Sequence, residues 1–300
     1  MTSAVETEDA LWKAYFSLCK PKVVALLLLT AVVGVVMASP PGQISLLTLL
    51  ASTLGIGLAA AAGAVINQVV EWESDAKMAR TEGRALPQGR ISCQNAFMFA
   101  IVLASASMFI LTAWVNTLTA VLTFASMIGY AVIYTMYLKK ATPQNIVIGG
   151  LAGATPPLLG WTSVTDSVDA EGLLMVLIIF TWTPPHFWAL AIHRREDYAK
   201  VNLPMLPVTH GVQFTKYAIL AYTVLMILVT LLPYLAYMAG LIYLISALLL
   251  GAYFLYMVLK LMFAEKANTA IRTFVYSINY LMLLFISMVV DHYFPIYPAL

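Results

Sequence analysis

Long apolar runs recur along the whole chain and strongly favour one kind of fold, a bundle of membrane-spanning helices. Crossing about 30 Å of hydrocarbon takes roughly 20 predominantly apolar residues. Nine stretches approach that length, at 23–39, 44–66, 96–114, 118–137, 146–161, 173–192, 217–237, 241–263 and 274–290. The chain is 62% hydrophobic with a mean hydropathy of +0.88, whereas a soluble globule is typically about 45 to 50% apolar. We therefore predict an all-α polytopic membrane protein with nine transmembrane helices in one bundle.

The connections between these stretches indicate one domain rather than several. Short turns at 40–42, 115–117 and 238–240 are rich in Pro, Gly and small polar residues, which join helices closely. We predict a single membrane-embedded domain over residues 1–300, with residues 1–20 as a segment preceding the first span.

The basic residues predict the orientation of the chain. All 16 Lys and Arg residues fall in the N-terminal segment or in alternate connections of the nine-helix plan, and one of the other connections is acidic, between 166 and 171. Because short cytoplasmic loops retain Lys and Arg, we expect a cytoplasmic N-terminus and an external C-terminus. The acids Glu6, Glu8 and Asp9 are unlike a transit peptide, which favours a bacterial-type plasma membrane. The net charge of +2 gives no indication of nucleic-acid binding.

A polar stripe follows the second apolar stretch. Asn67, Glu71 and Asp75 are four residues apart, so on a helix they lie on one face, about 6 Å apart along the axis. Three cations come next: Lys77, Arg80 and Arg84. Two carboxylates followed by cations suit a divalent metal that holds a phosphate-bearing substrate. An ordinary charged loop at a membrane boundary is the alternative.

Two further cytoplasmic segments carry polar features. Lys139 ends the fourth stretch, where it either anchors the topology or neutralises a phosphate. The double proline at 184–185 breaks the helical hydrogen-bond ladder inside an apolar span, which predicts a kink beside a cavity. His186 follows at once, either as a site residue or as a neutral histidine hydrogen-bonded between helices. His193, nearly two turns later, shares roughly the same face.

Four motifs together resemble one family. They are the Asn67 stripe, the Tyr-Thr-x-Tyr-Leu-Lys-Lys-x-Thr-Pro turn at 134–143, the Gly-Ala-Thr-Pro-Pro-Leu-Leu-Gly-Trp run at 153–161 and the Trp-Thr-Pro-Pro-His-Phe-Trp segment from 182. With them the chain resembles the UbiA-type membrane prenyltransferases from Lys20 to the ninth stretch. The segments at 184–188 and 204–207 resemble the branch that prenylates heme.

The resemblance implies a helical bundle around a lipid-open central cavity, with polar motifs at its cytoplasmic end and Mg²⁺ bridging acids to an isoprenyl diphosphate. Carried onto this sequence, it gives Asn67, Glu71 and Asp75 as catalytic residues, Glu71, Asp75 and Asp197 as metal ligands, and Lys77, Arg80, Arg84, Lys139, Arg194 and Arg195 as diphosphate ligands. We predict His186, and next His193, as heme contacts because neutral imidazole is a common iron ligand, and Tyr134 as a catalytic residue through cation–π attraction. Trp72 is a second aromatic candidate, beside Tyr134, for steadying an allylic cation. Two departures stand out: Glu71 replaces the usual Asp, and His193 and Asp197 stand where many members have two aspartates.

The activity that the resemblance implies is transfer of farnesyl from farnesyl diphosphate to a vinyl group of heme b, with water addition, giving heme O. The implied setting is the lipid bilayer, with heme A synthase or oxidase assembly proteins as candidate partners. An aromatic quinone-precursor acceptor is the nearest alternative, although it gives no reason for His186. A transporter is the alternative from another class, but the polar motifs lie at one membrane edge and no internal repeat is evident.

Overall fold

The computed structural model describes residues 11–263 and 268–296, so the predicted acids Glu6, Glu8 and Asp9 lie outside the described part. Eight of its helices are long and apolar enough to cross a membrane. They are α2 (Pro21–Ala38), α3 (Leu46–Asp75), α4 (Cys93–Trp114), the run of α5 (Thr117–Ile128), η1 (Gly129–Leu138) and α6 (Lys139–Ala141), α9 (Ala170–His193), α12 (Gly211–Leu235), α13 (Leu241–Met262) and α14 (Asn268–Tyr293). The predicted all-α polytopic membrane fold is confirmed.

The fifth predicted span corrects the count of nine single helices. It consists of α7 (Asn145–Ala154) and α8 (Pro156–Thr165), each 10 residues long, with Thr155 between them. Pro156 has no N–H to donate to the carbonyl of Ala152, which instead accepts from one of two hydroxyls, Ser126 Oγ at 3.1 Å or Thr155 Oγ1 at 2.9 Å, while the other hydroxyl donates within the pair. A hydropathy profile shows this stretch as one apolar run, because its prolines and glycines are uncharged and lower the average hydropathy only slightly.

The second proline pair behaves differently. α9 continues as one helix through Pro184 and Pro185, although neither proline has an N–H for the helical hydrogen-bond ladder, and the kink predicted there stays a prediction. Thr181 Oγ1 donates to Leu177 O and Thr183 Oγ1 donates to Ile179 O within the same helix. The cavity predicted beside this segment is present.

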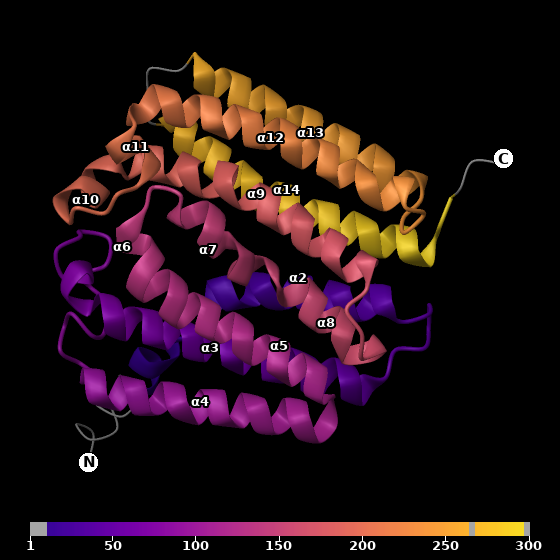
Figure 1. The fold of residues 1–300 in the computed structure, drawn as a ribbon, viewed down its shortest axis with the longest axis horizontal. Helices are drawn as coiled ribbons and strands as arrows, with labels where there is room; N and C mark the ends of the chain where they lie inside the picture. The colour runs from indigo at the N-terminus through magenta and orange to yellow at the C-terminus, as the bar shows by residue number, and fades with distance from the viewer. Residues whose placement is uncertain (1–10, 264–267, 297–300) are drawn as a thin grey trace, which may run out of the picture.

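The helices form two groups with the broken pair between them (Figure 1). α3, α4, α5 and η1 lie on one side, α2 lies beside the broken pair, and α9, α12, α13 and α14 lie on the other side, where Trp188, Tyr243, Tyr280 and Phe285 form a buried core. The short helices α6, α10 (Arg195–Lys200) and α11 (Leu206–Thr209) gather at one end of the bundle, opposite the end from which the C-terminus leaves.

Glycines let α2 and α8 cross almost in backbone contact. A Cβ added at Gly34 would lie 2.0 Å from the carbonyl oxygen of Pro157, and one added at Gly160 would lie 1.9 Å from that of Ala31. Close approach of small residues is a common way to pack helices in lipid. The crossing fixes α8 against α2, and both helices contribute walls to the cavity.

Candidate active site

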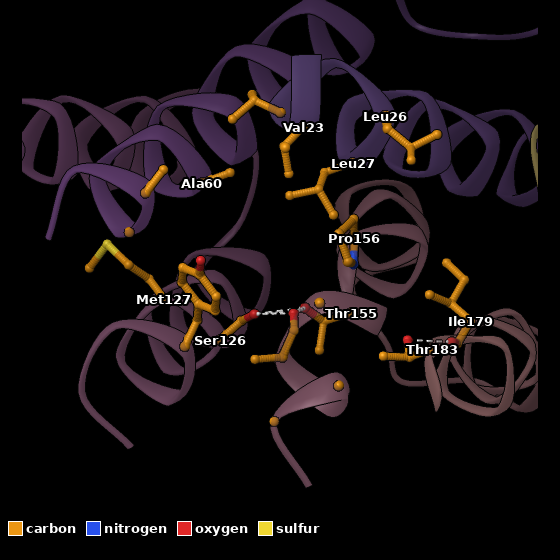
Figure 2. A pocket seen from close by; sticks show the side chains of 18 of the residues that line it. Val23, Leu26, Leu27, Ala60, Ser126, Met127, Thr155, Pro156, Ile179 and Thr183 are labelled. Carbon is orange, nitrogen blue, oxygen red and sulfur yellow. Dashed lines mark hydrogen bonds between the residues drawn. The ribbon is translucent and has the colours of Figure 1, made fainter. Parts of the chain in front are cut away.

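An apolar cavity of about 260 Å³ opens among α2, α3, α5, η1, α7, α8 and α9. Figure 2 shows Val23, Leu26 and Leu27 of α2 facing Ser126 and Thr155 across it, with a hydrogen bond joining the two hydroxyl-bearing side chains. The wall is mostly aliphatic and glycine-rich, so it suits a hydrocarbon chain rather than a polar ligand. The polar side chains Lys20, Tyr130, Tyr134 and His186 also line it.

Six charged or amide side chains meet at the end of α3, and we call them the polar cluster: Lys20, Asn67, Glu71, Asp75, Arg84 and Lys139. Lys139 Nζ lies 2.5 Å from Glu71 Oε1, and Arg84 Nη1 lies 2.5 Å from Asp75 Oδ2. Lys20 Nζ donates to Asn67 Oδ1 at 2.6 Å. Each residue of the predicted stripe therefore contacts a cation from another segment of the chain.

The stripe is held rigidly because it is largely buried. Asn67 is 3% and Asp75 1% exposed, and Asn67 Nδ2 donates to Thr135 Oγ1 of η1 at 3.2 Å. The next residue, Gln68, donates to the carbonyl of Leu18 at 2.7 Å, which ties the segment before α2 to α3. Burial without these partners would destabilise the fold, because unpaired polar groups in a low dielectric are unfavourable.

The π-helix η1 brings two tyrosines to the cavity. The rings of Tyr130 and Tyr134 are stacked, with centroids 5.8 Å apart and planes 18° apart. Thr135 Oγ1 donates to the carbonyl of Tyr130 at 2.8 Å, and a Cβ at Gly149 would lie 2.1 Å from the Tyr134 ring. π-helical turns often occur at functional sites. Here the turn places Tyr134 in the cavity wall, against Gly149 of α7, and its predicted catalytic role stays a prediction.

Trp72, the other predicted aromatic residue, does not line the cavity. Its side chain is 43% exposed, because it follows Glu71 by one position and so points about 100° away around the helix. The prediction that Trp72 faces an allylic cation is therefore wrong.

The helix α10 lies near the polar cluster. Burial raises the pKa of Tyr198, and the charges of Arg80, Glu71, Arg194 and Asp197 also act on this phenol. Arg194 Nη1 lies 3.6 Å from Asp197 Oδ2, so this predicted metal ligand is already paired. Arg194 Nε and His193 Nδ1 are buried without a hydrogen-bond partner in the described structure.

Three predicted diphosphate ligands make no ion pair in the described structure, although the charge of one of them, Arg80, acts on Tyr198. Lys77, Arg80 and Arg195 are exposed, and no ion pair involving them occurs within residues 11–263 and 268–296. The structure thus brings Arg84 and Lys139 to the stripe and leaves these three at the surface beside it.

The oxygen donors of the stripe fit a magnesium ion that arrives with its substrate. Across the described residues, no three His, Cys, Asp or Glu side chains converge as a ready metal cage, so Glu71, Asp75 and Asp197 do not form one. Mg²⁺ usually takes only one or two carboxylates, with phosphate oxygens and water completing its shell. Glu71 and Asp75, one helical turn apart, meet that requirement, whereas Asp197 is paired with Arg194.

His186 occupies the α9 wall of the cavity and is 7% exposed. Its ring is stacked between Trp182, at a centroid distance of 4.1 Å, and Phe274, at 4.5 Å. His186 Nδ1 lies 2.6 Å from Ser277 Oγ. His193 is not among the residues that line the cavity, so of the two predicted heme contacts only His186 reaches it.

Sequence reasoning missed Lys20 as a site residue. Its pKa is lowered to about 7, mainly by burial and then by the nearby charge of Arg84, while Glu71 opposes the shift. Pro21 occupies the first turn of α2, and Lys20 caps that turn in a left-handed conformation with φ 48°. The only sequence signal for a role of Lys20 in the site is its position directly before the proline that begins the first span. A lysine that only anchors the topology would have the same position.

An apolar cavity inside a helical bundle, with Lys20 of the polar cluster in its wall, defines an intramembrane enzyme for substrates with an anionic head and an apolar tail. The chain belongs to the UbiA prenyltransferase family, whose sequence model matches residues 27–289. The predicted resemblance to membrane prenyltransferases is thereby confirmed.

Relatives and solved structures agree with this assignment. The chain is 59% identical over 282 residues to protoheme IX farnesyltransferase 2 of Pseudoalteromonas atlantica, covering 94% of this chain and 92% of the relative. It is 56% identical over 288 residues to protoheme IX farnesyltransferase of Idiomarina loihiensis, covering 96% of both. These relatives confirm the predicted resemblance to the heme branch.

Two solved structures share the fold at low identity. A structure of digeranylgeranylglyceryl phosphate synthase has a TM-score of 0.79 at 19% identity and covers 95% of this chain and 99% of its own. A UbiA homolog from Archaeoglobus fulgidus bound to DMAPP and Mg²⁺ has a TM-score of 0.67 at 18% identity, covering 94% and 99%.

Proposed function

We propose that this protein transfers a farnesyl group from farnesyl diphosphate to a vinyl group of heme b, with addition of water, and so makes heme O. The observation that carries the proposal is the continuity of one apolar cavity from Lys20 of the polar cluster to His186 in the α9 wall. The diphosphate head of the donor would bind at the Lys20 end of the cavity, and the acceptor would bind at the His186 end. The close relatives named protoheme IX farnesyltransferase support this choice of donor and acceptor.

The polar cluster supplies the binding site for the diphosphate. Lys20, Arg84 and Lys139 each hold a carboxylate or amide oxygen in the free protein and can transfer their N–H donors to phosphate oxygens. Glu71 and Asp75 are then released to hold Mg²⁺, which supplies positive charge to the departing diphosphate. The solved UbiA homolog with DMAPP and Mg²⁺ supports this cofactor.

The cavity protects the allylic cation that forms when the diphosphate leaves. The stacked rings of Tyr130 and Tyr134 lie at its polar end, where their π faces can stabilise positive charge. The aliphatic wall below them excludes water that would otherwise capture the cation. Tyr134 is thus a catalytic residue in this proposal, and Asn67 orients Lys20 through its amide oxygen.

The remaining predicted residues have supporting roles. Arg194, with a buried Nε that lacks a partner, is the best placed to join the diphosphate site, and Asp197 holds it. Lys77, Arg80, Arg195 and His193 line the approach from the same membrane edge. We place this edge and the N-terminus in the cytoplasm and the C-terminus outside a cell membrane, where heme A synthase or oxidase assembly proteins would receive the product.

One reaction tests the activity. Purified protein is incubated with heme b, farnesyl diphosphate and Mg²⁺, and mass spectrometry is expected to find a heme that has gained a farnesyl group and water. The Glu71→Gln variant and a reaction with EDTA are the controls, and both should abolish the product. Absence of that product, with a prenylated aromatic acid in a parallel reaction, would assign the enzyme to a quinone-type acceptor instead.

The orientation has its own test. Cysteines replace Lys140, near the polar cluster, or Val168, in the connection before α9, in a variant whose native cysteines are serines. Both sites are exposed. A membrane-impermeant maleimide added to intact cells should label position 168 and leave position 140 unlabelled until the membrane is opened. The reverse pattern would contradict the orientation.

A further inference from the structure

Ser277 of α14 determines which nitrogen of His186 carries the proton. Ser277 Oγ lies 2.6 Å from the carbonyl oxygen of Phe274 and 2.6 Å from His186 Nδ1. A serine hydroxyl has one proton, and only donation can make the close contact with a carbonyl oxygen favourable. Its oxygen must therefore accept from His186, so Nδ1 carries the proton and Nε2 has a free lone pair.

The same residue also helps to orient the ring that stacks on His186. Trp182 Nε1 donates to the Ser277 carbonyl at 2.8 Å, and the Trp182 and His186 planes are only 20° apart. Phe274 covers the opposite face with its ring 28° from parallel. Ser277 is 0% exposed, so both contacts are shielded from water. The imidazole is thus fixed in tautomer, in plane and in rotation by residues of α9 and α14.

The free nitrogen has no protein partner. His186 lines the cavity, and Nε2 makes no hydrogen bond within the described structure. A histidine that only joined two helices would need just one such contact, and stacking on Trp182 and Phe274 would then serve packing alone. Neutral imidazole with a free nitrogen is, in contrast, the form that binds heme iron, and a hydrogen bond from the other nitrogen is its usual support.

We propose that Ser277 is a positioning residue for the acceptor: it holds His186 as the Nδ1–H tautomer and presents Nε2 as an axial ligand to the heme iron. This inference rests on the proposed function, because it takes heme b as the acceptor. It adds a residue that lies 91 positions from His186 in the sequence.

The test compares three serine variants by titration with ferric heme b. Ser277→Ala removes the acceptor for Nδ1–H, so we expect roughly 10- to 100-fold weaker heme binding, as for other changes in the support of metal ligands, and a shifted Soret band. Ser277→Thr keeps a hydroxyl and should restore the wild-type band. Ser287→Ala is the matched control, because Ser287 lies on the same helix and donates to Leu284 O with no histidine partner.

Farnesyl diphosphate binding separates a local effect from misfolding. Its affinity should stay within about twofold of wild type in all three variants, because the polar cluster is unchanged. If Ser277→Ala does not fold, His186→Gln takes its place, and loss of the wild-type Soret band with donor binding intact supports the proposal. A wild-type Soret band and affinity in Ser277→Ala or in His186→Gln overturns it. Failure of the wild-type protein to farnesylate heme overturns the proposed function instead.

Discussion

Farnesyl diphosphate binding should weaken as the pH rises from 7 to 9, because Lys20 loses its proton in that range. In the free protein, mainly through desolvation, the pKa of Lys20 is lowered to about 7. Lys20 lies directly before α2, outside the membrane-spanning segment. A bound diphosphate favours the ammonium form, so the pKa of Lys20 is higher in the complex than in the free protein. Binding is therefore strongest below pH 7 and is lost as the pH climbs from the free pKa toward the bound one.

The size of the effect follows from the shift. Each pH unit well above the free pKa weakens binding by up to about 1.4 kcal/mol, which is tenfold. At pH 7 about half of the Lys20 side chains are charged and at pH 9 about one in a hundred, so the dissociation constant should rise roughly 50-fold. The ionisation of the substrate contributes equally to every variant and cancels in the comparison.

Isothermal titration at pH 7, 8 and 9 measures this slope in wild type, Lys20→Arg and Lys20→Met. Arginine stays charged throughout, so Lys20→Arg should bind with little dependence on pH. Lys20→Met lacks a charged hydrogen bond and should bind about 10- to 150-fold more weakly than wild type at pH 7, again without a slope. A flat wild-type profile, or an unchanged slope in Lys20→Arg, would refute the assignment of the titrating group to Lys20.

Three other substitutions probe the site and the fold. Asp75→Asn should lower kcat about 100- to 1,000-fold with an unchanged circular dichroism spectrum, and near-normal turnover would remove Asp75 from the catalytic set. Gly160→Ala places a Cβ 1.9 Å from Ala31 O and should destabilise the protein by about 1 to 3 kcal/mol, seen as a lower thermal midpoint; an unchanged midpoint would contradict the tight crossing. Gly149→Ala displaces the Tyr134 ring and should lower kcat more than donor affinity, whereas wild-type kcat would show that the position of the ring does not matter.

The parts of this site that follow helical spacing could be predicted from sequence. Asn67, Glu71 and Asp75 share a face because their spacing is close to the helical period, and alternate loops with cations bring Lys139 to the same membrane edge. The same spacing also shows which residues cannot lie on that face. Trp72 follows Glu71 by one position, so its side chain points away from the stripe and is exposed.

Contacts that depend on tertiary packing left no comparable signal. Lys20 contacts Asn67, 47 residues away, and itself has a left-handed backbone directly before Pro21. Ser277 contacts His186, 91 residues away. The division of the fifth span at Thr155 was missed for another reason. A hydropathy profile does not distinguish a proline in the first turn of a helix from a proline inside a helix. The difference lies in which group donates to the carbonyl four residues before the proline.

The charges of the polar cluster lead to a prediction about the number of magnesium ions. With Lys20 neutral, the cations Arg84 and Lys139 balance the carboxylates Glu71 and Asp75, so the free site is electrically neutral. A fully ionised farnesyl diphosphate carries three negative charges and one Mg²⁺ carries two positive ones, which leaves a deficit of one positive charge. Protonation of Lys20 supplies it, because an unbalanced charge in a low dielectric is strongly unfavourable.

Binding should therefore take up about 0.9 proton at pH 8, where a group with a pKa of about 7 is about nine-tenths deprotonated. Titrations in buffers of different ionisation enthalpy measure this number directly. Uptake near 0.9 in wild type that is absent in Lys20→Met supports one ion, with Lys20 as the residue that completes the charge balance. Uptake near zero in wild type would contradict this charge balance and, like a flat pH profile, the assignment of the titrating group to Lys20.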